Sequence, residues 1–211
     1  MSVQNDLDEK FAIILKDVEE LKRNDAVFKT VFPADFVVKR ERGEADMAAL
    51  VRIIIGQQIS NKVATSLWQK LTDEIDPNDS QAILAATDDQ LRSYGLSRQK
   101  IAYVRGLAEA VDNHDIDIPS WIEKDDAAVM KEITALKGFG PWSAQMFMMF
   151  NLCHRHIWPS GDLGIQLGLQ RYFDMETRPS EKETLEMKKH FEGRETAASF
   201  LLWALKGDQL P

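Results

Sequence analysis

Residues 136–147, LKGFGPWSAQMF, place two glycines on either side of one aromatic residue and follow them with a proline and an apolar run. In a helix interior, Gly138 and Gly140 would cost about 1 kcal/mol each and Pro141 about 3 kcal/mol, so a helix ends before them. Glycine adopts the positive φ that a tight turn needs, and proline suits the first position of a new helix. The segment therefore predicts two helices joined by a short hairpin turn.

Such a turn can bind an anion. Its amides lie at the N-terminus of the second helix, where the helix dipole favours negative charge. Because Gly138 and Gly140 lack side chains, a DNA phosphate can approach the backbone closely without a dense cluster of lysines. The same residues also suit a hairpin whose glycines only allow two helices to pack tightly, and Gly-x-Gly alone does not decide between the two.

The rest of the chain must position this turn, and its periodicity is helical. Apolar residues recur at helix spacing, and Asp, Ser, Gly and Pro stand where helices begin or end. The helices expected are 6–23, 47–55, 60–75, 80–86, 88–94, 97–111, 119–123, 125–136, 142–152, 163–172, 180–190 and 196–205. A strand is suggested only at Phe36-Val37-Val38. We expect an all-α fold of two helical lobes around a cleft, forming a single domain over residues 1–211 with no separate linker.

Composition limits the function. The net charge is -8, which by itself disfavours a nucleic-acid partner, but residues 127–173 carry +2 and leave -10 for the remainder. No apolar run approaches the ~20 residues that a membrane-spanning helix needs, so no membrane partner is expected. One cysteine excludes an internal disulfide and a four-cysteine iron–sulfur or zinc site, which fits a cytoplasmic protein. His154 and His156 lack a third ligand at zinc-site spacing, so no metal centre is predicted.

Three further segments accompany the hairpin. IWPSGDLGIQ places Asp162 about twenty residues after the turn, IIIGQQISNKVA covers 53–64, and YGLSRQKIAYVRGLAEAV covers 94–111. These motifs, in this order and at these spacings, resemble the helix–hairpin–helix Gly/Pro–Asp superfamily of DNA glycosylases. The resemblance runs from about Asp46 to Trp203. It implies a base-excision repair enzyme that flips a damaged base out of double-stranded DNA and cleaves its N-glycosidic bond.

The resemblance assigns catalysis to Asp162. Breaking the C1′–N bond leaves positive charge on the sugar, and a nearby carboxylate stabilises that charge and can orient or deprotonate the attacking water. Asp162 also suits the N-cap of the helix that begins at Leu163, and the two roles are compatible.

The same resemblance identifies a base pocket. Trp142 and Trp203 match the pocket aromatics of the 3-methyladenine DNA glycosylase II branch, and Met146 stands where some members have a tyrosine. An electron-rich aromatic pocket attracts a base that alkylation has made cationic. Members that also nick the strand carry a lysine where this chain has Trp142, so no lyase activity is expected. The alternative for either tryptophan is packing in the core.

DNA contacts are implied for two loops. Gln57, Gln58 and Ser60 lie in the loop that enters the minor groove, with Gln58 as the candidate that fills the gap left by the flipped base; the alternative is support of a helix start at Ser60. The hairpin residues Gly138, Phe139 and Gly140 and the basic Arg155 are the expected phosphate contacts. The family often holds a monovalent cation on hairpin carbonyls, here those of Leu136 and Phe139, and no other cofactor is expected.

The sequence thus predicts a monofunctional glycosylase for alkylated bases of the 3-methyladenine and 7-methylguanine type, acting as a monomer. Two alternatives remain open: a glycosylase for oxidised or deaminated bases, and a non-catalytic helix–hairpin–helix module that binds DNA.

Overall fold

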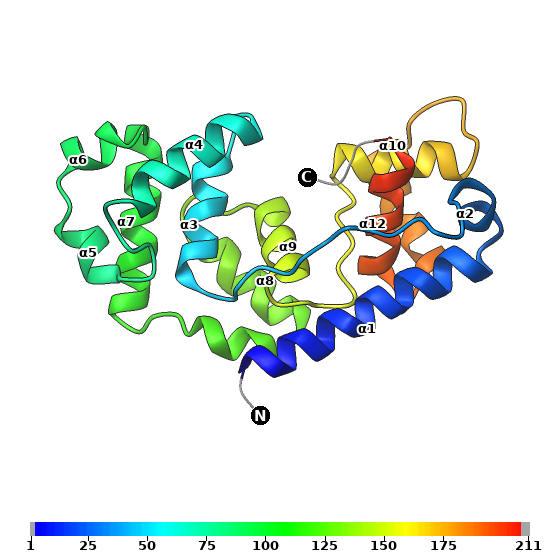
Figure 1. Ribbon diagram of the computed structural model, residues 1–211, viewed down its shortest axis with the longest axis horizontal. Coiled ribbons are helices and arrows are strands. Elements are labelled where there is room, and N and C mark those ends of the chain that lie inside the picture. The colour runs from blue at the N-terminus through cyan, green and yellow to red at the C-terminus, as the bar shows by residue number, and fades with distance from the viewer. Residues whose placement is uncertain (1–2, 208–211) are drawn as a thin grey trace. The chain divides into compact units, whose positions relative to one another are not determined.

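The computed structural model describes residues 3–207, and within that range every regular element is a helix (Figure 1). The chain divides into two compact units, which we call the central unit (residues 43–147) and the terminal unit (residues 3–42 and 148–207). The expectation of an all-α fold is confirmed. The division falls inside one helix, α9 (Pro141–Phe150), which begins in the central unit.

The central unit contains seven elements that precede α9 and the hairpin turn. They are α3 (Met47–Gly56), α4 (Asn61–Thr72), α5 (Ser80–Ala85), α6 (Asp88–Ser93), α7 (Arg98–Asp112), the 3₁₀ helix η1 (Ile118–Ile122) and α8 (Asp126–Ala135). Helix α7 packs against α3, α5 and α6. The apolar face of α3, including Leu50, Ile54 and Ile55, is fully buried. This burial fixes the end of α3 and therefore the start of the loop that follows it.

Side-chain caps set the helix starts in the central unit. Asp46, Ser60, Ser97 and Asp125 each precede a helix and accept a hydrogen bond from a backbone amide in its first turn. A capped start is typically about 1 kcal/mol more stable than one with an alanine in that position. Because Ser60 and Ser97 cap α4 and α7, the loops that precede these helices end at defined residues.

The terminal unit combines both ends of the described chain. It contains α1 (Val3–Asn24), α2 (Ala26–Val31), α10 (Leu163–Tyr172), α11 (Glu181–Met187), the 3₁₀ helix η2 (Lys188–Phe191) and α12 (Glu195–Leu205). Helix α12 packs against both α1 and α10. A Cβ on Gly168 would lie 2.4 Å from the carbonyl oxygen of Leu202, so glycine is required for α10 to approach α12 this closely. This close packing places the start of α10 beside the end of α12.

The predicted strand at residues 36–38 is wrong. Phe36, Val37 and Val38 lie in an irregular segment between α2 and α3. The carbonyl of Phe36 accepts a hydrogen bond from Nζ of the buried Lys22, and Val37 is 63% exposed. The described part of this unit contains no strand that could pair with a three-residue apolar run, so its backbone bonds locally, with Pro33 and Arg40, and with the Lys22 side chain.

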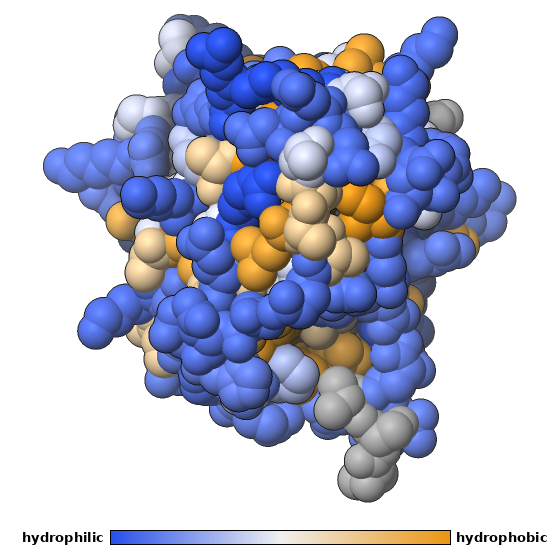
Figure 2. Space-filling view, turned by 90° about the vertical axis from the view of Figure 1, so that its left-hand side faces the viewer, coloured by the Kyte–Doolittle hydropathy of each residue, from blue (hydrophilic) through white to orange (hydrophobic). Residues whose placement is uncertain are grey.

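Several helix boundaries also differ from the expectations. The expected helix over 180–190 is α11 followed by the 3₁₀ helix η2, and the short segment at 119–123 is 3₁₀ rather than α. No helix in the described range is long and apolar enough to cross a membrane. Figure 2, which views the side where α5 and α6 lie in Figure 1, shows mostly hydrophilic residues around a smaller apolar area.

Candidate active site

Asp162 is the N-cap of α10, and two donors hold its carboxylate. Oδ1 accepts a hydrogen bond from the backbone amide of Ile165 at 2.9 Å and another from the indole Nε1 of Trp203 at 2.8 Å. The first bond is the capping interaction expected from the sequence, and the second comes from α12, 41 residues away. The carboxylate is therefore fixed by both the helix that it caps and the core of the terminal unit.

Gly164 makes this arrangement possible, and the sequence analysis did not identify it. A Cβ at position 164 would lie 2.6 Å from Cδ1 and 2.9 Å from Nε1 of Trp203, and 3.0 Å from Oδ1 of Asp162. Any side chain here would therefore push the indole away from the carboxylate. The sequence signal was present in DLG, a glycine two residues after the aspartate and inside a helix, where glycine is otherwise unfavourable.

The loop before Asp162 is also held in place. The amide of Asp162 donates to the carbonyl of Pro159 at 2.9 Å, and the side-chain amide of the buried Gln166 donates to the carbonyl of Ser160 at 2.9 Å. The indole of Trp158, which is buried, donates to the carbonyl of Thr184 at 2.9 Å. These bonds fix the entry of the chain into α10, so Asp162 has little freedom to move.

Trp203 belongs to an aromatic cluster that also contains a cation. Its ring stacks with those of Phe150 and Phe200, at centroid separations of 5.9 and 6.2 Å. The guanidinium of Arg40 lies 4.5 Å from the centroid of Phe150 and 6.0 Å from that of Trp203, and burial lowers the pKa of Arg40 to about 10. Trp203 is only 8% exposed, so it packs in the core, which was the alternative to a base-pocket role. Its Nε1 nevertheless contacts Asp162, the candidate catalytic group.

The hairpin turn forms as expected, but its two glycines differ. Gly138 has φ +95°, and a Cβ there would lie 2.4 Å from the ring of Tyr103. Gly140 is not in the left-handed region, and a Cβ there would meet nothing within 4 Å. The expectation that both glycines supply a positive φ is therefore wrong for Gly140. The fold requires glycine at 138, whereas at 140 glycine leaves open space above the backbone.

Phe139 anchors the turn. Its side chain is buried, and its amide donates to the carbonyl of Leu136 at 3.2 Å, so this amide serves the turn itself. That bond uses one lone pair of the Leu136 carbonyl, and a carbonyl oxygen has two. The second lone pair of this oxygen can still bind a cation. The turn is therefore compatible with a monovalent cation on the carbonyls of Leu136 and Phe139, which stays a prediction.

The loop between α3 and α4 contains the other predicted contact residues. Gln58 is exposed and adopts φ +60°, a conformation that non-glycine residues rarely occupy. The Nε2 of Gln57 donates to the carbonyl of Gly138 at 2.7 Å, which joins this loop to the hairpin. Ser60 is exposed and caps α4 through Oγ, which is the alternative that the sequence left open. Both predicted DNA loops are thus connected within the central unit.

Trp142 and Met146 lie four residues apart on α9, so they share one helix face. Trp142 is 50% exposed, in contrast to Trp203. A large exposed indole in the first turn after the hairpin is available for contact with a ligand.

Arg155 has a structural partner. Its Nε and Nη2 donate to Oδ2 and Oδ1 of the buried Asp17, at 2.5 and 2.7 Å, and this pairing raises the pKa of Arg155. The guanidinium therefore neutralises a buried carboxylate, and its predicted phosphate contact stays a prediction. Nδ1 of His156 lies 3.0 Å from Oε2 of the buried Glu195, within hydrogen-bond distance. Burial raises the pKa of Cys153 to about 12, so its thiol is not a nucleophile at neutral pH.

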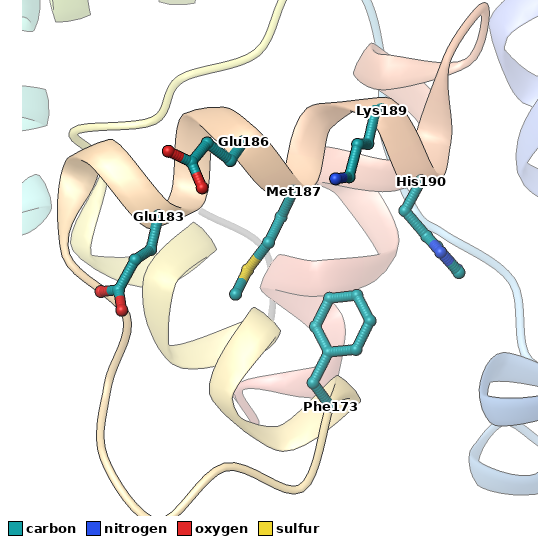
Figure 3. Close-up of a pocket in the computed structure, with 6 residues that line it drawn as sticks. All are labelled: Phe173, Glu183, Glu186, Met187, Lys189 and His190. Atoms are coloured by element: carbon teal, nitrogen blue, oxygen red, sulfur yellow. The ribbon is translucent and has the colours of Figure 1, made fainter.

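A pocket in the terminal unit contains none of the predicted site residues. It has a volume of about 500 Å³ and lies between α11, η2 and the residue that follows α10 (Figure 3). The side chains that line it are those of Phe173, Glu183, Glu186, Met187, Lys189 and His190. Its two carboxylates give it a different chemical character from an aromatic base pocket, and it does not include Asp162.

The structure thus forms two groups of predicted residues. Asp162 and Trp203 are in direct contact in the terminal unit, which also contains Arg155. The loop of Gln57, Gln58 and Ser60, the hairpin glycines with Phe139, and the pair of Trp142 and Met146 belong to the central unit. Sequence reasoning identified members of both groups but missed Gly164, Arg40 and the bond from Gln57 to Gly138.

Solved structures with this fold are known. The DNA-3-methyladenine glycosidase of Bacillus halodurans superimposes with a TM-score of 0.78 at 26% identity, covering 92% of this chain and 89% of that protein. The Schizosaccharomyces pombe 3-methyladenine DNA glycosylase Mag1, solved in complex with abasic DNA, gives a TM-score of 0.73 at 21% identity, covering 89% and 95%. The second likeness establishes the fold alone.

Sequence comparison supports the same relationship. The Bacillus subtilis (strain 168) protein YfjP is 25% identical over 162 residues, which is 73% of this chain and 56% of YfjP, so the chain spans little more than half of that relative. The sequence profile of one family matches residues 51–192, which include both predicted DNA loops, the hairpin and Asp162. The chain therefore belongs to the HhH-GPD superfamily of base excision DNA repair proteins.

Proposed function

We propose that this protein is a monofunctional DNA glycosylase that removes alkylated purines from double-stranded DNA and leaves an abasic site. The substrates that we propose are 3-methyladenine and 7-methylguanine, and the protein acts as a monomer. The observation that carries this proposal is the carboxylate of Asp162, fixed at the start of α10 by the indole of Trp203.

The chemistry follows from the carboxylate. The C1′–N bond breaks with its electron pair leaving on the base, and the sugar becomes an oxocarbenium-like cation. The negative charge of Asp162 stabilises this cation, and a water attacks C1′ while its proton passes to the carboxylate or to solvent. Because Asp162 is already held by two donors, little reorganisation is needed when the charge develops.

The lesion class follows from the aromatic residues. Methylation at N3 of adenine or N7 of guanine makes the base cationic and weakens its bond to the sugar, so a stacking aromatic pocket can select such bases. The exposed indole of Trp142, with Met146 on the same face, supports contact with a flipped base.

DNA binding is supported by the open backbone at Gly140 and by the exposed side chain of Gln58. The amides near Gly140 contact a phosphate at the N-terminus of α9, and Gln58 fills the gap that the flipped nucleotide leaves. This arrangement requires few basic residues, which is consistent with the net charge of -8.

One experiment tests the proposal: single-turnover excision from duplexes that each contain one lesion. Release of 3-methyladenine and 7-methylguanine, with little release of 8-oxoguanine or thymine glycol, is the expected result. Borohydride should trap no covalent adduct, because Trp142 stands where lyases have a lysine. Excision of an oxidised base alone, or a trapped adduct, would contradict the proposal, and excision of no base would favour a DNA-binding module.

A further inference from the structure

The loop that joins α3 to α4 is tied to the rest of the central unit at two points just before its exposed residue, Gln58. Before the loop, Nζ of Lys100 donates to the carbonyl of Ile55 at 2.7 Å, and burial lowers the pKa of this lysine. Within the loop, Nε2 of Gln57 donates to the carbonyl of Gly138 at 2.7 Å. The two bonds come from α7 and from the hairpin, elements 45 and 81 residues away in sequence.

Gln58 follows Gln57 directly and is strained. Its φ of +60° places a non-glycine residue in the left-handed region, a conformation that persists only where the surroundings determine it. Its side chain is exposed, so burial does not hold it there. The bonds of Lys100 and Gln57 just before Gln58, and the Ser60 cap of α4 just after it, are the fixed points that such a conformation requires.

The hairpin side of this connection is itself rigid. Gly138 packs so closely on Tyr103 that any side chain would collide with the ring, and the hydroxyl of Tyr103 accepts a hydrogen bond from Nε2 of Gln99 at 2.5 Å. The loop, the hairpin and the start of α7 together line a polar cavity of about 400 Å³. Gln57 therefore bonds with a carbonyl that has little freedom to move.

We propose that Gln57 is a positioning residue for gap filling: its bond to Gly138 sets the direction of the Gln58 side chain relative to the hairpin. The inference rests on the proposed function in two respects, that Gln58 enters the DNA and that the hairpin binds a phosphate. In this arrangement the hairpin binds a phosphate of any duplex, whereas Gln58 acts only where a nucleotide has left the stack. A rigid connection between them reduces the cost of ordering the loop on the DNA.

The two contributions can be separated with DNA that needs no excision. The dissociation constant for an undamaged duplex reports the hairpin, and that for a duplex with a tetrahydrofuran abasic-site analogue also reports gap filling. We divide the dissociation constant for the undamaged duplex by that for the duplex with the abasic-site analogue, both from fluorescence anisotropy at the same salt concentration. A high ratio means that the protein prefers DNA with a gap. A 2-aminopurine opposite the analogue reports insertion of a side chain into the stack.

Gln57→Met keeps the length of the side chain and removes the donor. We expect it to lower the ratio on the order of 10-fold, because binding of the duplex with the abasic-site analogue weakens much more than binding of the undamaged duplex. Gln57→Glu, which sets a carboxylate against the Gly138 carbonyl, should lower it further. The matched control is Gln69→Met, because Gln69 is exposed on α4 and its side-chain amide donates to Asp73, the residue that follows this helix, at 2.6 Å.

A double-mutant cycle with Gln58→Ala decides whether Gln57 acts through Gln58. If it does, Gln57→Met lowers the ratio less than 2-fold once Gln58 is alanine, and the 2-aminopurine signal no longer responds to it. An equal loss in both backgrounds, or an equal weakening for both duplexes, would overturn the inference and leave Gln57 as a hairpin support. A wild-type ratio near one would also overturn it. A high wild-type ratio without excision of methylated bases would instead refute the proposed substrates and leave the inference intact.

Discussion

The carboxylate of the terminal unit and the contact loops of the central unit differ in how they are held. Asp162 is partly buried, and its partner Trp203 is 8% exposed and surrounded by Phe150, Phe200 and Arg40. In the central unit the corresponding side chains point to solvent: Trp142 is 50% exposed and Gln58 is exposed. At these two residues the central unit fixes the backbone and leaves the side chain without a packed surrounding.

This difference matches what each region must do under the proposed function. A charge that stabilises a transient cation is most effective when it does not have to reorganise, so it benefits from a packed surrounding. Residues that contact DNA must be reachable, so their backbone is fixed while their side chains stay accessible. Substitutions of the buried residues that surround Asp162 should therefore change stability and catalysis together, and substitutions of the exposed residues in the central unit should leave stability nearly unchanged.

Asp162→Asn should have the largest effect. Asparagine is as good an N-cap as aspartate, and its amide oxygen can still accept from Ile165 and Trp203, so the fold is kept while the charge is lost. We expect a loss of about 10²-fold or more in single-turnover excision, with binding to an abasic-site analogue retained. Wild-type excision by this variant would show that Asp162 only caps α10.

The two tryptophans compare the two regions directly. Trp203→Ala removes a buried ring from the cluster with Phe150 and should lower the free energy of unfolding by about 3–5 kcal/mol. Trp142→Ala removes an exposed ring and should change it by about 0.5 kcal/mol. Both variants should reduce the excision of methylated bases. Urea unfolding measures the change in stability, and single-turnover assays measure the change in excision. Equal effects of the two on stability would contradict the contrast between the regions.

Gly164→Ala tests the contact between Trp203 and Asp162 without altering either residue. The new Cβ would lie 2.6 Å from the indole, so we expect a loss of about 1–3 kcal/mol in stability and slower excision. Gly106→Ala is the matched control, because Gly106 lies inside α7 and a Cβ there meets nothing within 4 Å. The control should gain about 0.5–1 kcal/mol. Excision as fast as wild type in Gly164→Ala would show that the indole is not needed beside the carboxylate.

Local patterns in the sequence were enough to predict most helices and the hairpin. Asp46, Ser97 and Asp125 marked helix starts correctly, and the glycines with Pro141 marked the turn. The failures were of a different kind. Phe36-Val37-Val38 has strand-like residues, yet a strand needs a partner that this unit does not offer in its described part. A pattern of three residues contains no information about that partner.

The sequence was enough to predict which residues belong to the candidate site, but not which of them contact one another. Motif spacing identified Asp162, Trp142 and Gln58, because each stands at a fixed offset from a turn or helix start. The bond from Trp203 to Asp162 and the position of Arg40 over Phe150 join residues far apart in the chain. Such contacts follow from how α12 packs on α10, which no local pattern encodes. Whether the predicted residues contact DNA or base stays a prediction.

Gly140→Asp should have the smallest effect, and it tests the central unit alone. Because Gly140 is not in the left-handed region and has open space above it, aspartate fits without strain, and the helical circular dichroism and unfolding free energy should stay as in wild type. Its carboxylate would instead occupy the space that a phosphate needs and repel it. We expect binding to weaken several-fold for damaged and undamaged duplexes alike, and more at low salt than at high salt. Gly140→Ala, which adds a methyl group and no charge, separates repulsion from blocked approach: a loss in both variants indicates close contact of the backbone with phosphate. Unchanged binding in the folded aspartate variant would show that the hairpin serves packing only, because a surface that holds phosphate at its amides cannot ignore a negative charge placed beside them.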